Sequence, residues 1–263
     1  MKILFISDIV GSPGRDAVKQ HLPALRQKYG PALIIANGEN AAGGFGITQK
    51  VTGELLGMGI DILTSGNHIW DKKEIMEYLD REGRLLRPAN YPPGVPGSGS
   101  AVVTARNGVK VGVLNLMGRA FMANLDCPFR RAKEEVAKLR DDGAKVVFVD
   151  FHAEATSEKI ALARYMDGEV VALVGTHTHV QTADERVFPR GTAYITDVGM
   201  TGPTESVIGV TIEAAIERFL THIPQRFETA KGDASLQAVV VTADPVTGLS
   251  KGIERINIGA DEG

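Results

Sequence analysis

The fold of this chain is decided by the segment that reads VVTARNGVKVGVLNL from Val102 to Leu116. Two runs rich in β-branched residues, Val102–Ala105 and Val109–Leu116, predict two consecutive strands. Too few residues separate these strands for a helix to fit between them, whereas neighbouring parallel strands need a crossover connection. The segment therefore argues against a purely parallel, doubly wound sheet and favours two mixed sheets packed together with helices outside.

On both sides of this segment, short apolar runs alternate with longer amphipathic stretches, as strands and helices do in an α/β fold. Further strands are predicted at Ile3–Ser7, Leu33–Ala36, Ile60–Thr64, Val146–Asp150, Val170–Val174, Ala193–Thr196, Leu236–Thr242 and Gly252–Ile258. Helices are predicted at Arg15–Lys28, Gln49–Gly57, Lys72–Leu79, Phe129–Arg140, Ser157–Met166 and Thr211–Leu220. The Gly/Pro-rich piece 88–99 is a surface loop rather than a linker, so one domain over residues 1–263 is expected.

Composition and charge disfavour several classes of protein. With 29 basic and 32 acidic residues the net charge is -3, and no long block of one sign predicts a nucleic-acid partner or a membrane patch. The single cysteine, Cys127, cannot form an intramolecular disulfide, which fits a reducing compartment. No segment reaches the roughly 18 apolar residues of a membrane span, so a cytoplasmic protein is expected. Assembly into a homo-oligomer stays open.

The candidate functional residues stand at the ends of predicted strands. Side chains at the carboxyl ends of neighbouring strands converge on one crevice of an α/β sheet, even when they are distant in sequence. Mixed oxygen and imidazole ligands suit iron, manganese or zinc better than calcium. Taken singly, each residue also has an ordinary structural role, but together they predict a two-metal hydrolase. The blocks are Asp8, Gly38-Glu39-Asn40, Gly66-Asn67-His68, His152 and Gly175-Thr176-His177-Thr178-His179.

The order of these blocks resembles the calcineurin-like metallophosphoesterase superfamily, whose signature runs Asp-x-His, Gly-Asp, Gly-Asn-His, His, Gly-His-x-His. The departures are similar to the YmdB-like subfamily of cyclic-nucleotide phosphodiesterases, in which Gly-Glu-Asn stands where Gly-Asp usually does. This chain has Gly38-Glu39-Asn40 at that place. The resemblance implies a four-layer α/β/β/α sandwich of two mixed β-sheets flanked by helices.

The resemblance also implies a ligand set for two divalent or mixed-valence metal ions, iron or manganese in the first place and zinc as an alternative. The second histidine of the superfamily motif would fall at Val10, whose side chain cannot coordinate a metal. The subfamily resemblance suggests that Asn40 takes its place. The first metal would be held by Asp8, Glu39, Asn40 and His179. The second would be held by Glu39, Asn67, His152 and His177.

The activity that this resemblance implies is hydrolysis of a small cyclic nucleotide, either a 2′,3′-cyclic or a 3′,5′-cyclic monophosphate. A hydroxide bridging the metals would attack phosphorus, and His68 would protonate or stabilise the leaving oxygen. Two alternatives stay open. One is a phosphomonoesterase or nucleotidase with the same dinuclear site, and the other is a regulatory protein that senses a nucleotide without hydrolysing it.

Several residues around this site keep two interpretations each. Asp71 either orients His68 or caps the following helix, and the cap is favoured because Ile69 and Trp70 separate the two residues. Asp150 is either an acceptor for a ligand imidazole or a surface strand end. The remaining candidates for the substrate pocket are the glycine-rich segment 43–48, Arg119 and the segment 199–203.

Overall fold

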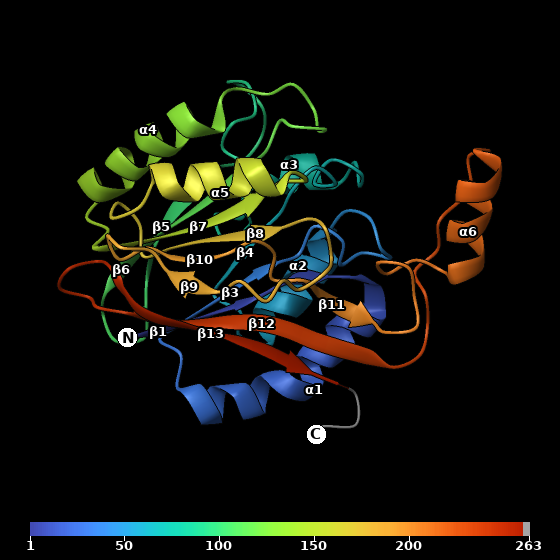
Figure 1. The fold of residues 1–263 in the computed structure, drawn as a ribbon, viewed down its shortest axis with the longest axis horizontal. Helices are drawn as coiled ribbons and strands as arrows, with labels where there is room; N and C mark the ends of the chain where they lie inside the picture. The colour runs from blue at the N-terminus through green and yellow to red at the C-terminus, as the bar shows by residue number, and fades with distance from the viewer. Residues whose placement is uncertain (260–263) are drawn as a thin grey trace.

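The computed structural model describes residues 1–259. Two sheets pack face to face, and helices cover their outer faces (Figure 1). Ile3 and Phe5 of the first sheet meet Val113 and Phe148 of the second in a buried layer between the sheets, where the rings of Phe5 and Phe148 stack with centroids 5.5 Å apart. The prediction of two mixed sheets is confirmed.

The first sheet places three parallel strands side by side. β1 pairs in parallel with β3 and β3 with β4, while the long β12 pairs antiparallel to β1 on its other side. All three parallel strands therefore end at the same edge of the sheet. In spatial order the strands are β2 (Asp8–Ile9), β11 (Met200–Pro203), β12 (Ala234–Ala243), β1 (Lys2–Ile6), β3 (Leu33–Asn37) and β4 (Ile62–Thr64), with β13 (Ser250–Ile258) also paired to β12.

The second sheet contains the segment that decides the fold. Its first two strands form an antiparallel hairpin in which Val102 faces Gly112 and Val103 faces Val111, and the next strands along the sheet are parallel. Each sheet is therefore mixed, as the missing crossover between Val102 and Leu116 predicts. The order is β5 (Ser100–Thr104), β6 (Lys110–Met117), β7 (Val146–His152), β8 (Ala172–Thr176), β10 (Ala193–Ile195) and β9 (Arg186–Val187).

The helices complete the outer layers. α1 (Gly11–Tyr29), α2 (Gln49–Gly57) and the short α3 (Ile75–Leu79) pack against the first sheet. α4 (Pro128–Asp141) and α5 (Thr156–Tyr165) cover the second. Within residues 1–259, no helix combines the length and the apolar character that crossing a bilayer requires.

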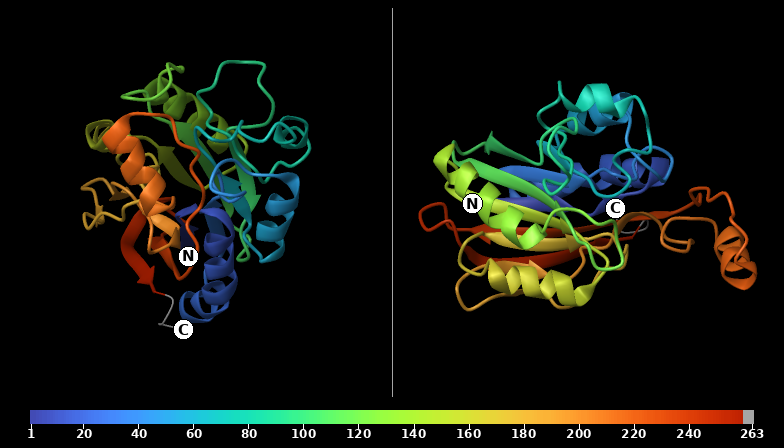
Figure 2. Two further views of the ribbon diagram at one scale, coloured as in Figure 1. Left: turned by 90° about the vertical axis from the view of Figure 1, so that its right-hand side faces the viewer. Right: turned by 90° about the horizontal axis from the view of Figure 1, so that it is seen from above.

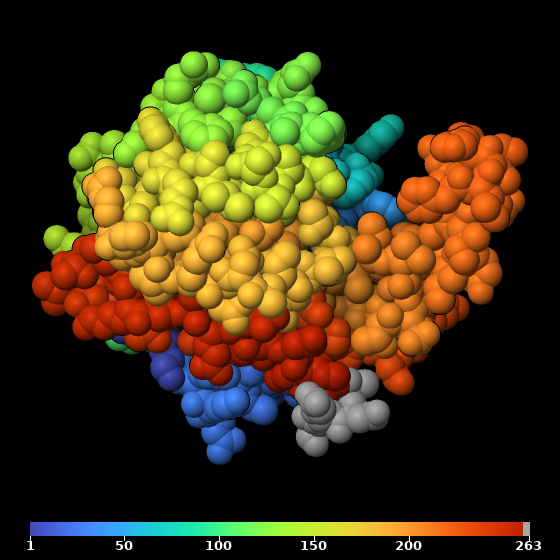
Figure 3. Space-filling view, viewed as in Figure 1, coloured from blue at the N-terminus to red at the C-terminus, as the bar shows by residue number. Residues whose placement is uncertain are grey.

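The last helix, α6 (Ile212–Thr221), projects from the body. It lies on an arm, residues 204–233, whose ends are joined where Thr204 N–H donates to the Asp233 carbonyl at 2.9 Å. The arm extends beyond both sheets in Figure 2 and forms a separate lobe in the space-filling view of Figure 3. Ala215 is the buried residue of α6, whereas Phe219 and Leu220 are 77% and 79% exposed.

The predicted elements differ from the structure mainly at their ends. β2, β9 and β11 were not predicted, because β2 and β9 have only two residues, too few to show a period, and β11 contains Gly202 and Pro203, which indicate a loop. α1 begins at Gly11, earlier than predicted, since Pro13 lies in the first turn, where its missing N–H costs no helical hydrogen bond. α3 begins at Ile75 rather than Lys72. Residues 260–263 of the predicted domain lie outside the described residues.

Candidate active site

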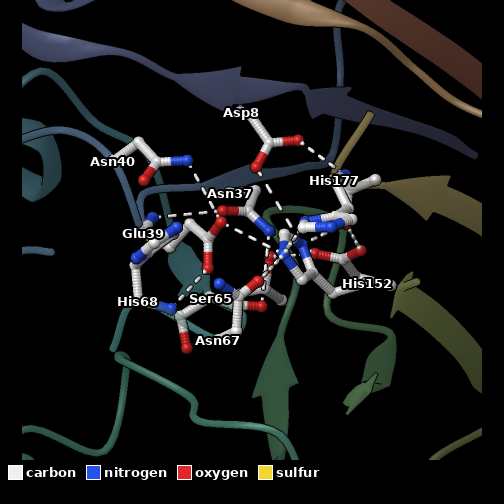
Figure 4. A network of polar contacts seen from close by, with 12 residues as sticks. Asp8, Asn37, Glu39, Asn40, Ser65, Asn67, His68, His152 and His177 are labelled. Carbon is white, nitrogen blue, oxygen red and sulfur yellow. Dashed lines mark hydrogen bonds and ion pairs between the residues drawn. The ribbon is translucent and has the colours of Figure 1, made fainter. Parts of the chain in front are cut away.

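The predicted ligands all lie at carboxyl ends of parallel strands, and Figure 4 shows several of them pointing toward one another. Asp8 follows β1, Glu39 and Asn40 follow β3, and Asn67 follows β4, all in the first sheet. The second sheet supplies His152 from the end of β7 and both His177 and His179 from the loop after β8. The site is therefore built across the edges of two sheets, one contributing carboxylates and amides and the other imidazoles.

One group of ligand atoms converges on Nε2 of His152. Glu39 Oε1 lies 3.1 Å from this nitrogen, Asn67 Oδ1 lies 3.0 Å from it and His177 Nδ1 lies 3.0 Å from it. His152, Glu39 and His177 offer atoms within 4.8 Å of one another, a spacing that can hold a metal ion. Two imidazole nitrogens facing each other need a proton or a cation between them, so this group fits a metal.

A second group of atoms lies on the other side of Glu39. Asn40 Nδ2 is 3.1 Å from Glu39 Oε1 and 3.3 Å from His179 Nε2, and Asp8 Oδ1 is 3.9 Å from the same histidine nitrogen. Glu39 therefore belongs to both groups. This is the arrangement expected when one carboxylate bridges two cations.

Two buried oxygens in the second group lack a protein partner. Asp8 Oδ1 and Asn40 Oδ1 have no hydrogen-bond partner although both side chains are buried. An unsatisfied buried polar atom costs about 1–3 kcal/mol, and more when it is charged. A cation would satisfy the Asp8 oxygen where it stands, and a half-turn of the Asn40 amide would exchange its nitrogen and oxygen and aim the oxygen at Glu39 and His179. The donor set therefore fits a second metal.

The electrostatics of the cluster are dominated by burial and by opposed charges. Burial raises the pKa of Asp8 above its ordinary value. Burial also acts against the charged form of His152, but the carboxylates of Glu39, Asp8 and Asp150 together outweigh it and raise the histidine pKa to about 9. Burial together with the nearby His152 lowers the pKa of His177 to about 3. His177 is therefore neutral near pH 7 and keeps a lone pair for a metal.

The imidazole of His152 is held from behind by a buried chain of polar groups. Its Nδ1 lies 3.0 Å from Thr176 Oγ1, which donates to Asp150 Oδ1 at 2.8 Å. Asp150 is fully buried and also accepts from Asn37 and Thr64. The surface interpretation of Asp150 is therefore wrong, and its contact with the imidazole runs through Thr176. Because Thr176 donates to Asp150, it accepts from Nδ1–H of His152 and leaves Nε2 facing the cluster.

The two histidines after β8 are oriented by groups that were not predicted. His177 Nε2 lies 3.2 Å from Glu154 Oε2, and His179 Nδ1 lies 2.8 Å from the Ile208 carbonyl on the arm. Both histidines have positive φ, 103° and 63°, a region that non-glycine residues seldom occupy. The only sequence signal for Glu154 is its position two residues after His152. No sequence signal points to a backbone carbonyl such as that of Ile208.

His68 lies at the rim of the cluster between Asp71 and Phe45. Its Nδ1 is 2.8 Å from Asp71 Oδ2, and the Phe45 ring lies edge-on with centroids 5.1 Å apart. The favoured interpretation of Asp71 as a helix cap is wrong, because α3 begins at Ile75 after Glu74. A tight turn, in which Asp71 N–H donates to the His68 carbonyl, brings Asp71 back to the imidazole. Nε2 is then the ring nitrogen left for a substrate.

A cavity of about 250 Å³ opens beside His68, Glu39 and His177. Gly44 and Phe45 of the predicted segment 43–48 line it. Arg119 does not belong to the described lining residues, and its exposed backbone N–H donates to Glu158 instead. Met200 and Pro203 of the predicted segment 199–203 line a neighbouring hollow of about 680 Å³ that also touches His179.

The fold is the one found in calcineurin-like phosphoesterases. A crystal structure of the calcineurin-like phosphoesterase YfkN from Bacillus subtilis superimposes with a TM-score of 0.62 over 99% of this chain and 90% of that one, at 14% identity, a likeness in fold. A hypothetical protein from Thermus thermophilus gives a TM-score of 0.92 at 43% identity, covering 99% and 100% of the two chains. The predicted four-layer sandwich is confirmed.

The sequence comparisons narrow this class to one family. The family described as YmdB-like protein matches residues 4–256, and the chain belongs to it. A Bacillus subtilis protein named 2′,3′-cyclic-nucleotide 2′-phosphodiesterase is 52% identical over 261 residues, which cover 99% of this chain and 98% of that protein. The predicted family resemblance is therefore confirmed.

Proposed function

We propose that this protein is a metal-dependent phosphodiesterase that hydrolyses cyclic nucleotides, with 2′,3′-cyclic monophosphates before 3′,5′-cyclic ones. The name and 52% identity of the Bacillus relative support the substrate class. The observation that carries the proposal is the position of Glu39, whose carboxylate contacts His152 of one ligand group and Asn40 of the other. A carboxylate shared in this way is what a dinuclear hydrolase requires.

The proposed ligands are those of the two groups around Glu39. Asp8, Asn40 and His179 complete one group, while Asn67, His152 and His177 complete the other. When bound, two cations would supply the positive charge that activates water and offsets charge on the phosphate. The mixed oxygen and nitrogen donors suit iron, manganese and zinc, and we propose iron or manganese on the family resemblance.

His68 is the proposed catalytic residue. Its Nδ1 is engaged by Asp71, so its Nε2 can donate a proton to the leaving oxygen of the ester. The Asp71 carboxylate fixes the direction of the ring. His68 lines the cavity and is not one of the proposed metal ligands, so it can act on substrate while the ligand set stays intact.

A substrate panel together with elemental analysis tests this function. Protein purified without added metal should contain iron or manganese and hydrolyse 2′,3′-cyclic nucleotides, with 3′,5′-cyclic nucleotides as the second set. Turnover of nucleoside monophosphates alone would assign a phosphomonoesterase instead. Binding of cyclic nucleotides without turnover by the metal-loaded protein would assign a sensing role.

Three broader proposals accompany this function. The single Cys127 and the small-molecule substrate support a cytoplasmic location, which fractionation of cells would test. The continuous buried layer between the sheets supports a single domain, and limited proteolysis should then leave one resistant core. Assembly into a homo-oligomer is tested by the molar mass in solution.

A further inference from the structure

The cavity beside the cluster has two chemically different sides. The polar side carries Glu39, His68 and His177. The facing wall is apolar, and most of it comes from the arm. This apolar wall consists of Phe45, Val207, Ile208, Val210, Phe219 and Phe227. A cavity with reactive groups on one side and aromatic and aliphatic side chains on the other suits a ligand with a charged end and a flat apolar end.

The apolar wall has no side chain that could read a hydrogen-bonding pattern. Apart from the proposed ligands and His68, the described residues that line the cavity bring no hydroxyl, amide or charged side chain into it. No described lysine or arginine is present to hold a second phosphate group. A ligand can therefore form apolar and stacking contacts with this wall. The side chains of the wall offer no hydrogen bonds to its polar edges.

Val10 extends the wall to the cluster. The valine is 2% exposed, follows Asp8 by two residues and lines the same cavity. Where the superfamily motif has a metal-binding histidine, this chain thus places an apolar surface, and Asn40 lies close by, because its carbonyl accepts from the Gly11 N–H at 3.0 Å. The departure at Val10 widens the apolar side of the cavity.

We propose that the apolar wall is the subsite for the nucleobase and that it accepts all bases, so that the substrate class is any nucleoside cyclic monophosphate. This inference rests on the proposed function. Every base has a face that can stack on an aromatic ring, so stacking does not distinguish strongly between one base and another. The Phe45 ring touches His68 and also lines the cavity, so a base on the wall keeps its cyclic phosphate next to His68.

The arm contacts the catalytic centre at its root and is largely exposed at its far end. The Ile208 carbonyl accepts from His179 at 2.8 Å, which holds the root of the arm against the ligand group. Phe219, further out on α6, is 77% exposed. A large aromatic side chain in water at the mouth of a cavity gains from being covered, and a stacked base would cover it.

The test compares nucleotides with an ester that lacks a base. The substrates are the 2′,3′-cyclic phosphates of adenosine, guanosine, cytidine and uridine and the 2,3-cyclic phosphate of methyl riboside. The wild-type protein should hydrolyse the four nucleotides with kcat/KM values within about tenfold of one another. The base-free ester should be about tenfold poorer or worse, the loss expected for one stacked base.

Two variants on the arm and a matched control separate base binding from chemistry. Phe219→Ala and Phe227→Ala should raise KM for the four nucleotides about tenfold and leave the base-free ester unchanged. Phe121→Ala, which removes a 92% exposed phenylalanine outside the cavity, should change neither. Because Phe219 is largely exposed, its loss leaves the core intact.

Three results would overturn the inference. They are equal losses for nucleotides and base-free ester in the arm variants, wild-type turnover of the base-free ester as fast as nucleotides, and a preference of about 100-fold or more for one base. If no cyclic phosphate is hydrolysed, the proposed function is wrong. Equilibrium binding of the same five compounds to the wild type and to Phe219→Ala then tests by itself whether the apolar wall binds the base.

Discussion

Lys159 Nζ lies 2.8 Å from Asp197 Oδ2, and both side chains are fully buried. The same carboxylate oxygen accepts from the backbone N–H and the hydroxyl of Thr178. Thr178 stands between His177 and His179, whose backbone is held at positive φ. The buried ion pair thus anchors the loop that presents two of the proposed metal ligands.

Replacing Asp197 with asparagine should therefore weaken both the fold and the metal site. Removing one partner of a buried pair leaves an uncompensated charge on Lys159, which costs roughly 3 kcal/mol or more in the free energy of unfolding. Loosening the ligand loop should lower metal affinity about tenfold to a hundredfold. Denaturant unfolding and metal titration measure the two effects.

The matched control for that variant is Glu134→Gln. Glu134 forms an ion pair with Arg131 at 3.1 Å and its side chain is 61% exposed, and such a surface pair contributes about 1 kcal/mol or less. Its loss should leave metal affinity unchanged. A change below about 0.5 kcal/mol for Asp197→Asn, a size typical of surface substitutions, would contradict the anchoring role.

His68→Ala should remove catalysis and keep the metals. General acid catalysis contributes about 10²–10⁴-fold, so kcat for cyclic nucleotides should fall by that factor. The proposed ligands do not include His68, so the metal content measured by elemental analysis should equal that of the wild type. Unchanged turnover would remove His68 from the reaction.

Asp71→Asn should have a smaller effect in the same direction. The variant keeps a side chain of the same size next to His68 but loses the charged acceptor that holds Nδ1 of the ring. Because the Asp71 side chain is 40% exposed, water replaces part of this interaction, and we expect a fall in kcat of about tenfold. A fall as large as that of His68→Ala would assign Asp71 a role beyond orientation.

Asn40→Ala should empty one of the two proposed metal positions. The alanine removes a ligand from the group of Asp8 and His179 but leaves Asn67, His152 and His177 untouched. Elemental analysis should then give about one metal per chain where the wild type gives two. Retention of both metals would show that Asn40 does not replace the histidine missing at Val10.

Chelation should lower the thermal stability of the wild-type protein. Ions that bind only the folded state stabilise it by mass action, and here they would also satisfy the orphaned oxygens of Asp8 and Asn40. Treatment with a chelator should reduce the melting temperature, and readdition of manganese should restore it. Asn40→Ala should show a smaller reduction, because it has one ion less to lose.

The sequence predicted where the candidate site residues lie, because they stand at or shortly after the ends of strands, while their role as metal ligands stays a prediction. The apolar runs that stop before Asp8, at Asn37 and at His152 locate the carboxyl ends of β1, β3 and β7, and the fold brings such ends together. The contacts that orient the imidazoles could not be predicted. Glu154 and the Ile208 carbonyl reach His177 and His179 through loop geometry, which has no period in sequence.

The misread role of Asp71 has the same physical origin. A cap requires the helix to begin directly after the acidic residue, but residues 71–74 form bends and turns and α3 starts at Ile75.

The arm is a second feature that the sequence pattern predicts only in part. The amphipathic pattern at Thr211–Leu220 predicted a helix, yet the pattern does not tell whether an apolar face meets a core, a ligand or water.

The division of the ligands between two sheets gives the centre a mechanical property. Asp8 and Glu39 move with one half of the sandwich, while His152 and His177 move with the other. A sliding of either half by about one ångström would separate the donor pairs that span the two sheets, such as Glu39 and His152, since catalytic groups must be held to within about 0.5 Å. Hydrolytic activity would therefore depend on how firmly the two halves of the sandwich pack together, and the proposed metal ions would hold the two halves in register.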